Sequence, residues 1–177
     1  MRVLICLLLL GSPSLGLAAG DDGFTAPTPT ETTTTCSGAK IWDERTRKCV
    51  DARDSSLSDQ DRFQAVRELA YAGAYDRAKS VLATFASPAA SGAQTYAGFL
   101  ARKTGDMDAA FVHYRRALET NPDNLLVRSY MGQAFVEIGD TEAARAQLRE
   151  IRARGGRQTW PEFALASAIR SGQGYAY

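Results

Sequence analysis

A regular spacing of glycines constrains the fold of this 177-residue chain more than any other feature. The four glycines lie 32, 34 and 33 residues apart, at Gly73, Gly105, Gly139 and Gly172. Small or apolar residues stand seven and four positions before each of them, and alanine stands five positions after the first three. Self-similarity at a period of this size predicts a stack of repeated structural units.

Each unit reads as two helices of about 13 residues, with the periodic glycine at the turn between them. Glycine suits the left-handed residue that ends the first helix. Asp106 and Asp140 directly follow their glycines and can cap the second helix. Pro122 ends the second helix of the middle unit, because proline cannot extend it. The alanines after the turns allow the two helices to approach closely, so we expect an all-α fold.

This pattern resembles the tetratricopeptide repeat family. The match is best over residues 91–124, holds over 125–158 and is degenerate over 59–90, and a capping helix with a tail follows at 159–177. The residues that carry it are Gly73, Ala78, Gly98, Gly105, Ala110, Tyr114, Pro122, Gly132, Gly139 and Ala144. The resemblance implies a short right-handed solenoid of helix–turn–helix repeats, and three units plus a terminal helix meet the minimum for a stable array.

Residues 1–18 have the order of a secretory signal peptide. Arg2 precedes an apolar run at residues 4–10, and small residues at Gly16 and Ala18 suit cleavage after Ala18 or at a neighbouring bond. The apolar run is far shorter than the ~20 residues that span a bilayer. We therefore expect an exported protein, periplasmic or extracellular, with no membrane insertion after cleavage. The chain as a whole also looks like secreted alphaproteobacterial members of the family with an N-terminal Cys…Trp-Asp…Cys loop, which favours the periplasm.

A tether and a small loop are expected between the signal peptide and the repeats. Residues 19–35 are rich in threonine, proline and acidic residues, which predicts a disordered tether. Once the signal peptide with Cys6 is removed, Cys36 and Cys49 are the two remaining cysteines, and in an exported chain they predict a structural disulfide that closes residues 36–50. A zinc site would need further ligands.

Trp42 lies in the middle of that loop among charged residues. A loop this small needs its one large apolar side chain for its own packing, so we expect Trp42 to pack over the disulfide or against the following domain. The alternative is an exposed tryptophan that binds a sugar or an aromatic partner.

In the family that the pattern resembles, ligands lie along a concave face lined by the first helix of each unit. Helical spacing assigns to the exposed side of these helices the candidate groove residues Phe63, Arg67, Tyr71, Phe99, Arg102, Lys103, Gln133 and Glu137. Their aromatic rings and three cations suit an extended peptide with an acidic group or a free carboxylate, which arginine can bind through two hydrogen bonds. Arg67, Phe99 and Gln133 stand where the chaperone-binding members have asparagine, so that specificity is not expected. An ordinary solvated face, with its aromatic rings packed between units, is the alternative.

Little in the sequence favours catalysis or nucleic-acid binding. The 21 Lys and Arg residues against 20 Asp and Glu residues give a formal charge of +1, whereas nucleic-acid binders concentrate basic residues. His113 is the only histidine, and neither a catalytic triad nor a phosphate-binding loop has support in the spacing. We expect a scaffold that binds a protein or peptide without enzyme activity, cofactor or metal. The alternatives are an envelope glycan binder that uses the Trp42 loop and a weak envelope hydrolase.

The last residues, 173–177, have two interpretations. Terminal units of a repeat array need a cover, so the tail is expected to cap the exposed face of the last helix. It could instead be a segment that another protein binds.

Overall fold

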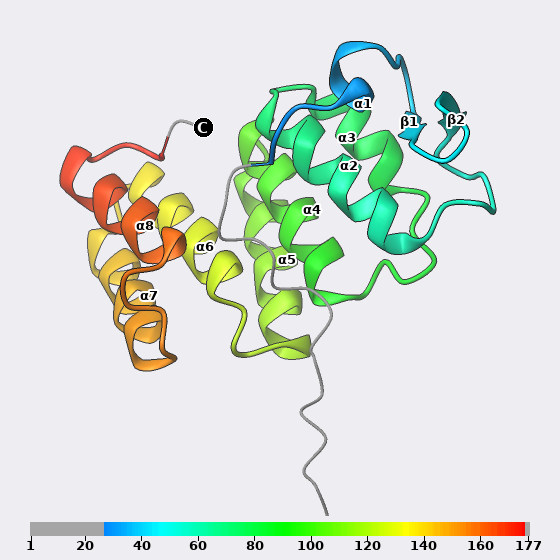
Figure 1. The fold of residues 1–177 in the computed structure, drawn as a ribbon. Coiled ribbons are helices and arrows are strands. Elements are labelled where there is room, and N and C mark those ends of the chain that lie inside the picture. The colour runs from blue at the N-terminus through cyan, green and yellow to red at the C-terminus, as the bar shows by residue number, and fades with distance from the viewer. Residues whose placement is uncertain (1–26, 176–177) are drawn as a thin grey trace, which may run out of the picture.

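The computed structural model describes residues 27–175, which form one β-hairpin and eight helices (Figure 1). In chain order the elements are α1 (Glu31–Thr34), β1 (Lys40–Asp43), β2 (Lys48–Asp51), α2 (Asp59–Tyr71), α3 (Tyr75–Leu82), α4 (Ser91–Lys103), α5 (Met107–Thr120), α6 (Leu125–Glu137), α7 (Thr141–Ala153) and α8 (Trp160–Ser171). The predicted signal peptide at 1–18 and the first part of the predicted tether lie outside the described residues.

From α2 onward the helices form consecutive pairs. α2 packs on α3, α4 on α5 and α6 on α7, while α8 packs against both helices of the preceding pair. The first helices of successive units also contact one another, so α2, α4, α6 and α8 follow one another along one side of the stack (Figure 1). This arrangement confirms the predicted all-α array of helix–turn–helix units that ends in a single helix.

The turn after each first helix has the left-handed conformation predicted for its glycine. The φ angles are 74°, 90°, 82° and 70° at Gly73, Gly105, Gly139 and Gly172. The predicted caps are also present, because Asp106 accepts from the Ala109 N–H at 3.0 Å and Asp140 accepts from the Ala143 N–H at 2.9 Å. The first unit lacks such a cap, since Ala74 stands at the N-cap position of α3, and this helix has only 8 residues.

Small residues allow the helices of a unit to approach closely. Ala78, Ala110 and Ala144 are each 0% exposed, at the positions predicted from the period. A methyl group added at Gly98 would lie 2.5 Å from the ring of Tyr114, which is itself fully buried. The contact between α4 and α5 therefore requires the absence of a side chain at residue 98.

The hydrophobic core is continuous through most of the array. Its largest cluster runs from Ile41 of the hairpin through Leu69 and Tyr96 to Val127 of α6. Two smaller clusters, around Ala144 and Ile151, join α7 to α8. The N-terminal hairpin thus shares the main core, whereas the last two helices are held by separate, smaller ones.

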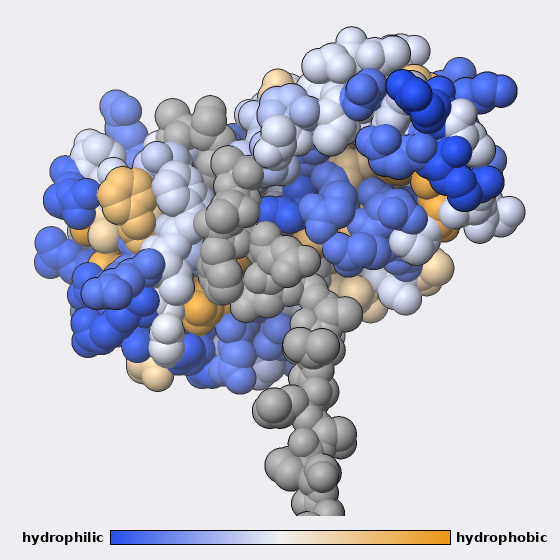
Figure 2. Space-filling model, viewed as in Figure 1, coloured by the Kyte–Doolittle hydropathy of each residue, from blue (hydrophilic) through white to orange (hydrophobic). Residues whose placement is uncertain are grey.

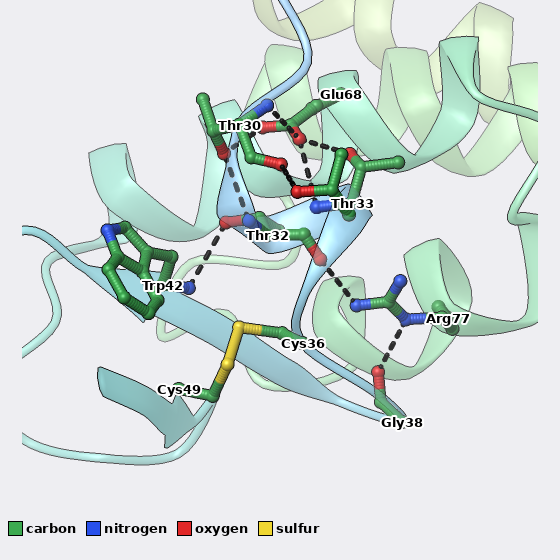
Figure 3. The surroundings of a disulfide bond; sticks show 10 residues. Thr30, Thr32, Thr33, Cys36, Gly38, Trp42, Cys49, Glu68 and Arg77 are labelled. Carbon is green, nitrogen blue, oxygen red and sulfur yellow. Dashed lines mark hydrogen bonds between the residues drawn. A yellow bond between two sulfur atoms is a disulfide. The ribbon is translucent and has the colours of Figure 1, made fainter. Parts of the chain in front are cut away.

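The N-terminal segment is more ordered than its composition predicts. The sequence predicts a disordered tether as far as residue 35, but Thr30 caps the short helix α1, which packs on α2. The buried carboxylate of Glu68 accepts hydrogen bonds from the backbone N–H and the hydroxyl of both Thr30 and Thr33 (Figure 3). Burying a carboxylate is costly without donors, and the threonines supply them. The predicted tether is therefore wrong for residues 30–35.

The disulfide between Cys36 and Cys49 is present as predicted, with the two Cα atoms 5.5 Å apart. The segment it closes is an antiparallel β-hairpin, which the sequence reasoning did not foresee, and Trp42 faces Cys49 across the two strands. The short turn at residues 44–47 and the two four-residue strands gave too brief an alternation to be recognised as β-structure.

Arg77 of α3 fixes the hairpin and α1 to the repeats. Its guanidinium donates to the carbonyl oxygen of Thr32 at 2.7 Å and to that of Gly38 at 2.9 Å (Figure 3). Together with Glu68 on α2, it holds the N-terminal segment on the first helical pair.

Candidate partner-binding face

The predicted groove residues meet on the side of the stack formed by α2, α4, α6 and α8, which we call the inner face. Neighbouring rings lead from one unit to the next: Tyr71 is stacked on Phe99 at 6.4 Å, and Phe99 is tilted against Tyr130 at 4.9 Å, measured between ring centroids. The hydroxyl groups of Tyr71 and Tyr130 are 3.3 Å apart. Burial is the main cause of the raised pKa of Tyr71. These rings thus form a continuous aromatic seam between the first helices of three units.

Arg102 lies at the centre of the inner face. Its guanidinium donates to Glu137 at 2.8 Å and to the side-chain oxygen of Gln133 at 3.4 Å. Its carbon Cζ is 5.6 Å from the centroid of the Phe99 ring and 5.9 Å from that of Tyr130, distances at which a cation is attracted to the π-face. The structure therefore brings three other predicted groove residues, Phe99, Gln133 and Glu137, around the buried cation of Arg102.

Four predicted groove residues are buried, which corrects the expectation that the whole set is exposed. Arg67 and Arg102 are each 4% exposed, and Phe99 and Gln133 are 0% exposed. The reason is that first helices of adjacent units contact one another directly, so residues on the seam between them face a neighbouring helix. Phe99 illustrates this, with its ring close to those of Tyr96 and Tyr130.

The remaining predicted residues keep access to solvent. Lys103 is partly buried with its ammonium group 5.7 Å from the Phe99 ring, and burial lowers the pKa of this lysine. Glu137 lies at the open edge, where its side chain is 29% exposed. Phe63 lies apart from the central cluster: its ring is edge-on to Tyr96 at 5.5 Å and lines a separate hollow with Phe85.

Sequence reasoning missed three aromatic residues of this region, Tyr96, Tyr130 and Phe163. Each stands nine positions before a periodic glycine, one position away from the expected exposed side. Tyr96 and Tyr130 lie edge to face at 6.2 Å within the seam between α4 and α6. The shared offset in the period is a signal that could have identified them as one recurring position.

The end of the described chain also lies on the inner face. After the left-handed residue Gly172, residues 173–175, which we call the tail, turn back toward α6. The Tyr175 N–H donates to the side-chain oxygen of Gln133 at 3.2 Å. The Tyr175 ring is edge-on to that of Trp160 at 5.0 Å. The tail thus contacts α8, as expected of a cap, and in addition reaches a predicted groove residue on α6.

The other candidate residues lie elsewhere. Trp42 is partly buried, and its backbone N–H donates to the Thr32 hydroxyl at 3.1 Å. Hydrophilic residues dominate the surface where the hairpin lies, at the upper right of Figure 2. His113 on α5 is 2.8 Å from the side-chain oxygen of Gln94, and burial lowers its pKa.

Within residues 27–175, no group of three or more His, Cys, Asp or Glu side chains is arranged to hold a metal ion. In the same part of the chain, no helix has the length and apolar character to cross a membrane.

Comparison with known proteins agrees with this architecture. A family model described as "Tetratricopeptide repeat" matches residues 101–167. The "Probable biofilm formation methyltransferase WspC" of Pseudomonas putida is 33% identical over 96 residues, which cover 53% of this chain and 22% of that protein. The chain therefore spans less than a quarter of the length of this relative. No solved structure matches the chain significantly.

Proposed function

Because this chain is a member of the tetratricopeptide repeat family, whose repeats serve as scaffolds for protein–protein interaction, we propose that it binds an extended peptide segment on its inner face. Stacked helical repeats present a continuous surface suited to such ligands. The observation that carries the proposal is the hydrogen bond from the Tyr175 N–H to Gln133, in which a side chain of this face accepts from a backbone amide. The partly exposed rings of Tyr71 and Trp160 on first helices offer apolar contact to such a segment.

The charges of the inner face support a partner segment with an acidic group or a free carboxylate. Arg67, Arg102 and Lys103 all lie on this face, and Glu137 is the one predicted groove residue of opposite charge. Since Arg102 already donates to Glu137 at 2.8 Å, an incoming carboxylate would share Arg102 with Glu137 or replace it. Lys103, partly buried at the edge, is the cation best situated to meet such a group first.

The proposed activity is non-covalent, without cofactor or metal, in an exported protein whose residues 1–18 serve as the signal peptide. The methyltransferase name belongs to a relative that shares only 22% of its length with this chain, so no transfer chemistry is inferred from it. His113, the only histidine of the sequence, contacts Gln94 in the α4–α5 pair. This contact does not involve Arg102 or the groove residues around it. Recognition by the repeats remains the function that these residues support best.

A charge reversal at the edge of the inner face tests the proposal. Lys103→Glu should reduce crosslinked capture of the native partner from the cell envelope by at least about tenfold, because it replaces attraction with repulsion. Arg145→Glu is the matched control, since Arg145 is an exposed cation on α7, a second helix of its unit. Circular dichroism should show equal helicity in both variants. Equal capture by Lys103→Glu and the wild type would refute binding on the inner face.

A further inference from the structure

The tail crosses the inner face instead of lying on the outer side of the last helix. Phe163 of α8 remains 53% exposed, although its ring centroid is 6.1 Å from that of Tyr175. A segment whose purpose was to cover α8 would bury this side chain. The tail passes to α6 instead, where it meets Gln133 and Glu137.

Gly174 fits against the central ion pair because it has no side chain. A Cβ atom built at this residue would clash with the carboxylate of Glu137, and it would lie 3.2 Å from Nη1 of Arg102. The carboxylate oxygen that such an atom would meet first is the one that accepts the 2.8 Å hydrogen bond from Arg102, so a side chain at residue 174 would disturb this bond. The inner face therefore accommodates a glycine at this point and an aromatic residue directly after it.

Both the backbone and the ring of Tyr175 anchor the tail. Its backbone N–H donates to Gln133 at 3.2 Å, and its ring meets those of Trp160 at 5.0 Å and Phe163 at 6.1 Å in edge-to-face arrangements. Edge-to-face contacts of this kind are favourable beyond the area they bury. A backbone hydrogen bond and an aromatic anchor together are what a peptide ligand of a helical groove would supply.

We propose that the tail is a built-in ligand of the inner face, and that a partner peptide must displace it to bind. This regulation rests on the proposed function, because it concerns the same residues. The tail is joined to α8 by Gly172, so its local concentration at the face is in the millimolar range or above, as for short flexible links. Contacts too weak to hold a separate peptide are then sufficient to keep the tail bound. A partner succeeds when its segment reproduces the glycine–aromatic pair and adds contacts that the tail lacks.

The test measures competition in the full-length chain. The probe is a fluorescein-labelled peptide with the sequence of residues 171–177, acetylated and amidated at its ends, titrated to about 1 mM protein by fluorescence anisotropy. Tyr175→Ala removes the aromatic anchor of the tail and should strengthen probe binding by about tenfold relative to the wild type. Gln173→Ala is the matched control, because Gln173 is exposed and its hydrogen bonds with the Ser171 hydroxyl are made by its backbone.

Three outcomes of the titration would overturn the proposal. The first is equal affinity of the probe for the wild type and for Tyr175→Ala. The second is the absence of binding to Tyr175→Ala at the highest concentration. The third is equal binding of a probe that itself carries Tyr175→Ala. Capture from the envelope separates this failure from that of the proposed function. Partner capture that depends on Lys103 but does not increase in Tyr175→Ala leaves the binding face intact and removes the regulation. Competition by the probe without any Lys103-dependent capture of a partner leaves the tail bound to the inner face and removes the proposed function.

Discussion

The guanidinium of Arg102 in α4 donates a 2.8 Å hydrogen bond to the carboxylate of Glu137 in α6 and thereby joins two successive units across the inner face. The Arg102 side chain is 0% exposed and that of Glu137 is 29% exposed, so the pair is largely shielded from water. A cation in this position depends on its partner, because removal of one member of a buried pair leaves an uncompensated charge.

Glu137→Ala should lower the free energy of unfolding by about 2 kcal/mol, because it removes a carboxylate that pairs with the buried guanidinium of Arg102. The matched control is Glu150→Ala, since Glu150 pairs with Arg154 at 3.2 Å on the surface, with side chains 47% and 30% exposed. That control should cost at most about 1 kcal/mol. Urea unfolding followed by circular dichroism measures both changes. Equal costs in the two variants would mean that Arg102 does not require Glu137.

Gly98→Ala should destabilise the chain, although alanine favours helices. Residue 98 is inside α4, where replacing glycine by alanine normally gains about 1 kcal/mol. Here the new methyl group would lie 2.5 Å from the Tyr114 ring, and overpacking of this kind costs about 1–3 kcal/mol. We expect a net loss of about 1 kcal/mol in urea unfolding. A gain in stability would show that α4 and α5 can separate at no cost. Combining Gly98→Ala with Tyr114→Leu should recover part of the loss.

Removal of the disulfide should loosen the hairpin while the repeats stay folded. For the separation of 13 residues between Cys36 and Cys49, the chain-entropy argument gives a cost of about 3 kcal/mol. In a Cys36→Ala, Cys49→Ala variant, amide hydrogen exchange should accelerate over β1 and β2 and stay unchanged over α4 to α6. Exchange that accelerates equally in α6 would contradict the prediction, because it would make the hairpin part of one global unfolding unit.

Glu68→Gln should release α1 from the first helical pair. The carboxylate of Glu68 accepts from both backbone and hydroxyl donors of Thr30 and Thr33, and an amide offers one oxygen in place of two. Amide exchange over α1 should become at least about tenfold faster, as expected when charge-assisted hydrogen bonds are lost. Asp76→Asn is the control, since Asp76 is an exposed carboxylate on the neighbouring helix α3. Unchanged exchange over α1 in Glu68→Gln would show that another contact holds this helix.

Stability should fall below neutral pH because of His113. Burial lowers the pKa of this histidine from its ordinary value of about 6.5, so the folded state favours the neutral ring. The resulting stability is fully present above about pH 6.5 and is lost as the pH falls through the lower pKa of the folded state. His113→Gln should flatten this part of the curve when the free energy of unfolding is measured between about pH 5 and pH 8. A curve with the same slope in His113→Gln would assign the effect to other groups.

The repeats could be predicted from the sequence because their determinants are local. A glycine such as Gly105 adopts the left-handed conformation at the end of its own helix. Asp106 caps the next helix by accepting from the N–H three residues further on. The inner face was only partly predictable. Spacing along one helix placed Arg102 on the correct side, but its burial depends on Phe99, Tyr130 and Glu137, of which two belong to the next unit.

The N-terminal segment could not be predicted because its order comes from contacts that are distant in sequence. Thr30 and Glu68 are 38 residues apart. The threonine-rich sequence itself does not indicate that its N–H and hydroxyl groups donate to a carboxylate of α2. The tail presents the same difficulty, since the bond from Tyr175 to Gln133 spans 42 residues. At both ends of the described chain, a polar side chain on a first helix, Glu68 or Gln133, contributes to this long-range anchoring.

The docking of the hairpin on α2 and α3 makes the two ends of the array unequal in stability. In a linear stack, a terminal unit has one neighbour instead of two and is the first to fray. At the N-terminal end, the hairpin and α1 take the place of the missing neighbour. Ile41 of the hairpin lies in the main core, and the disulfide between Cys36 and Cys49 crosslinks this segment. At the opposite end, α8 is joined to α6 and α7 through the two smaller clusters. Loss of structure on heating or under tension therefore starts at α8, the helix that supports the tail, and travels toward the hairpin.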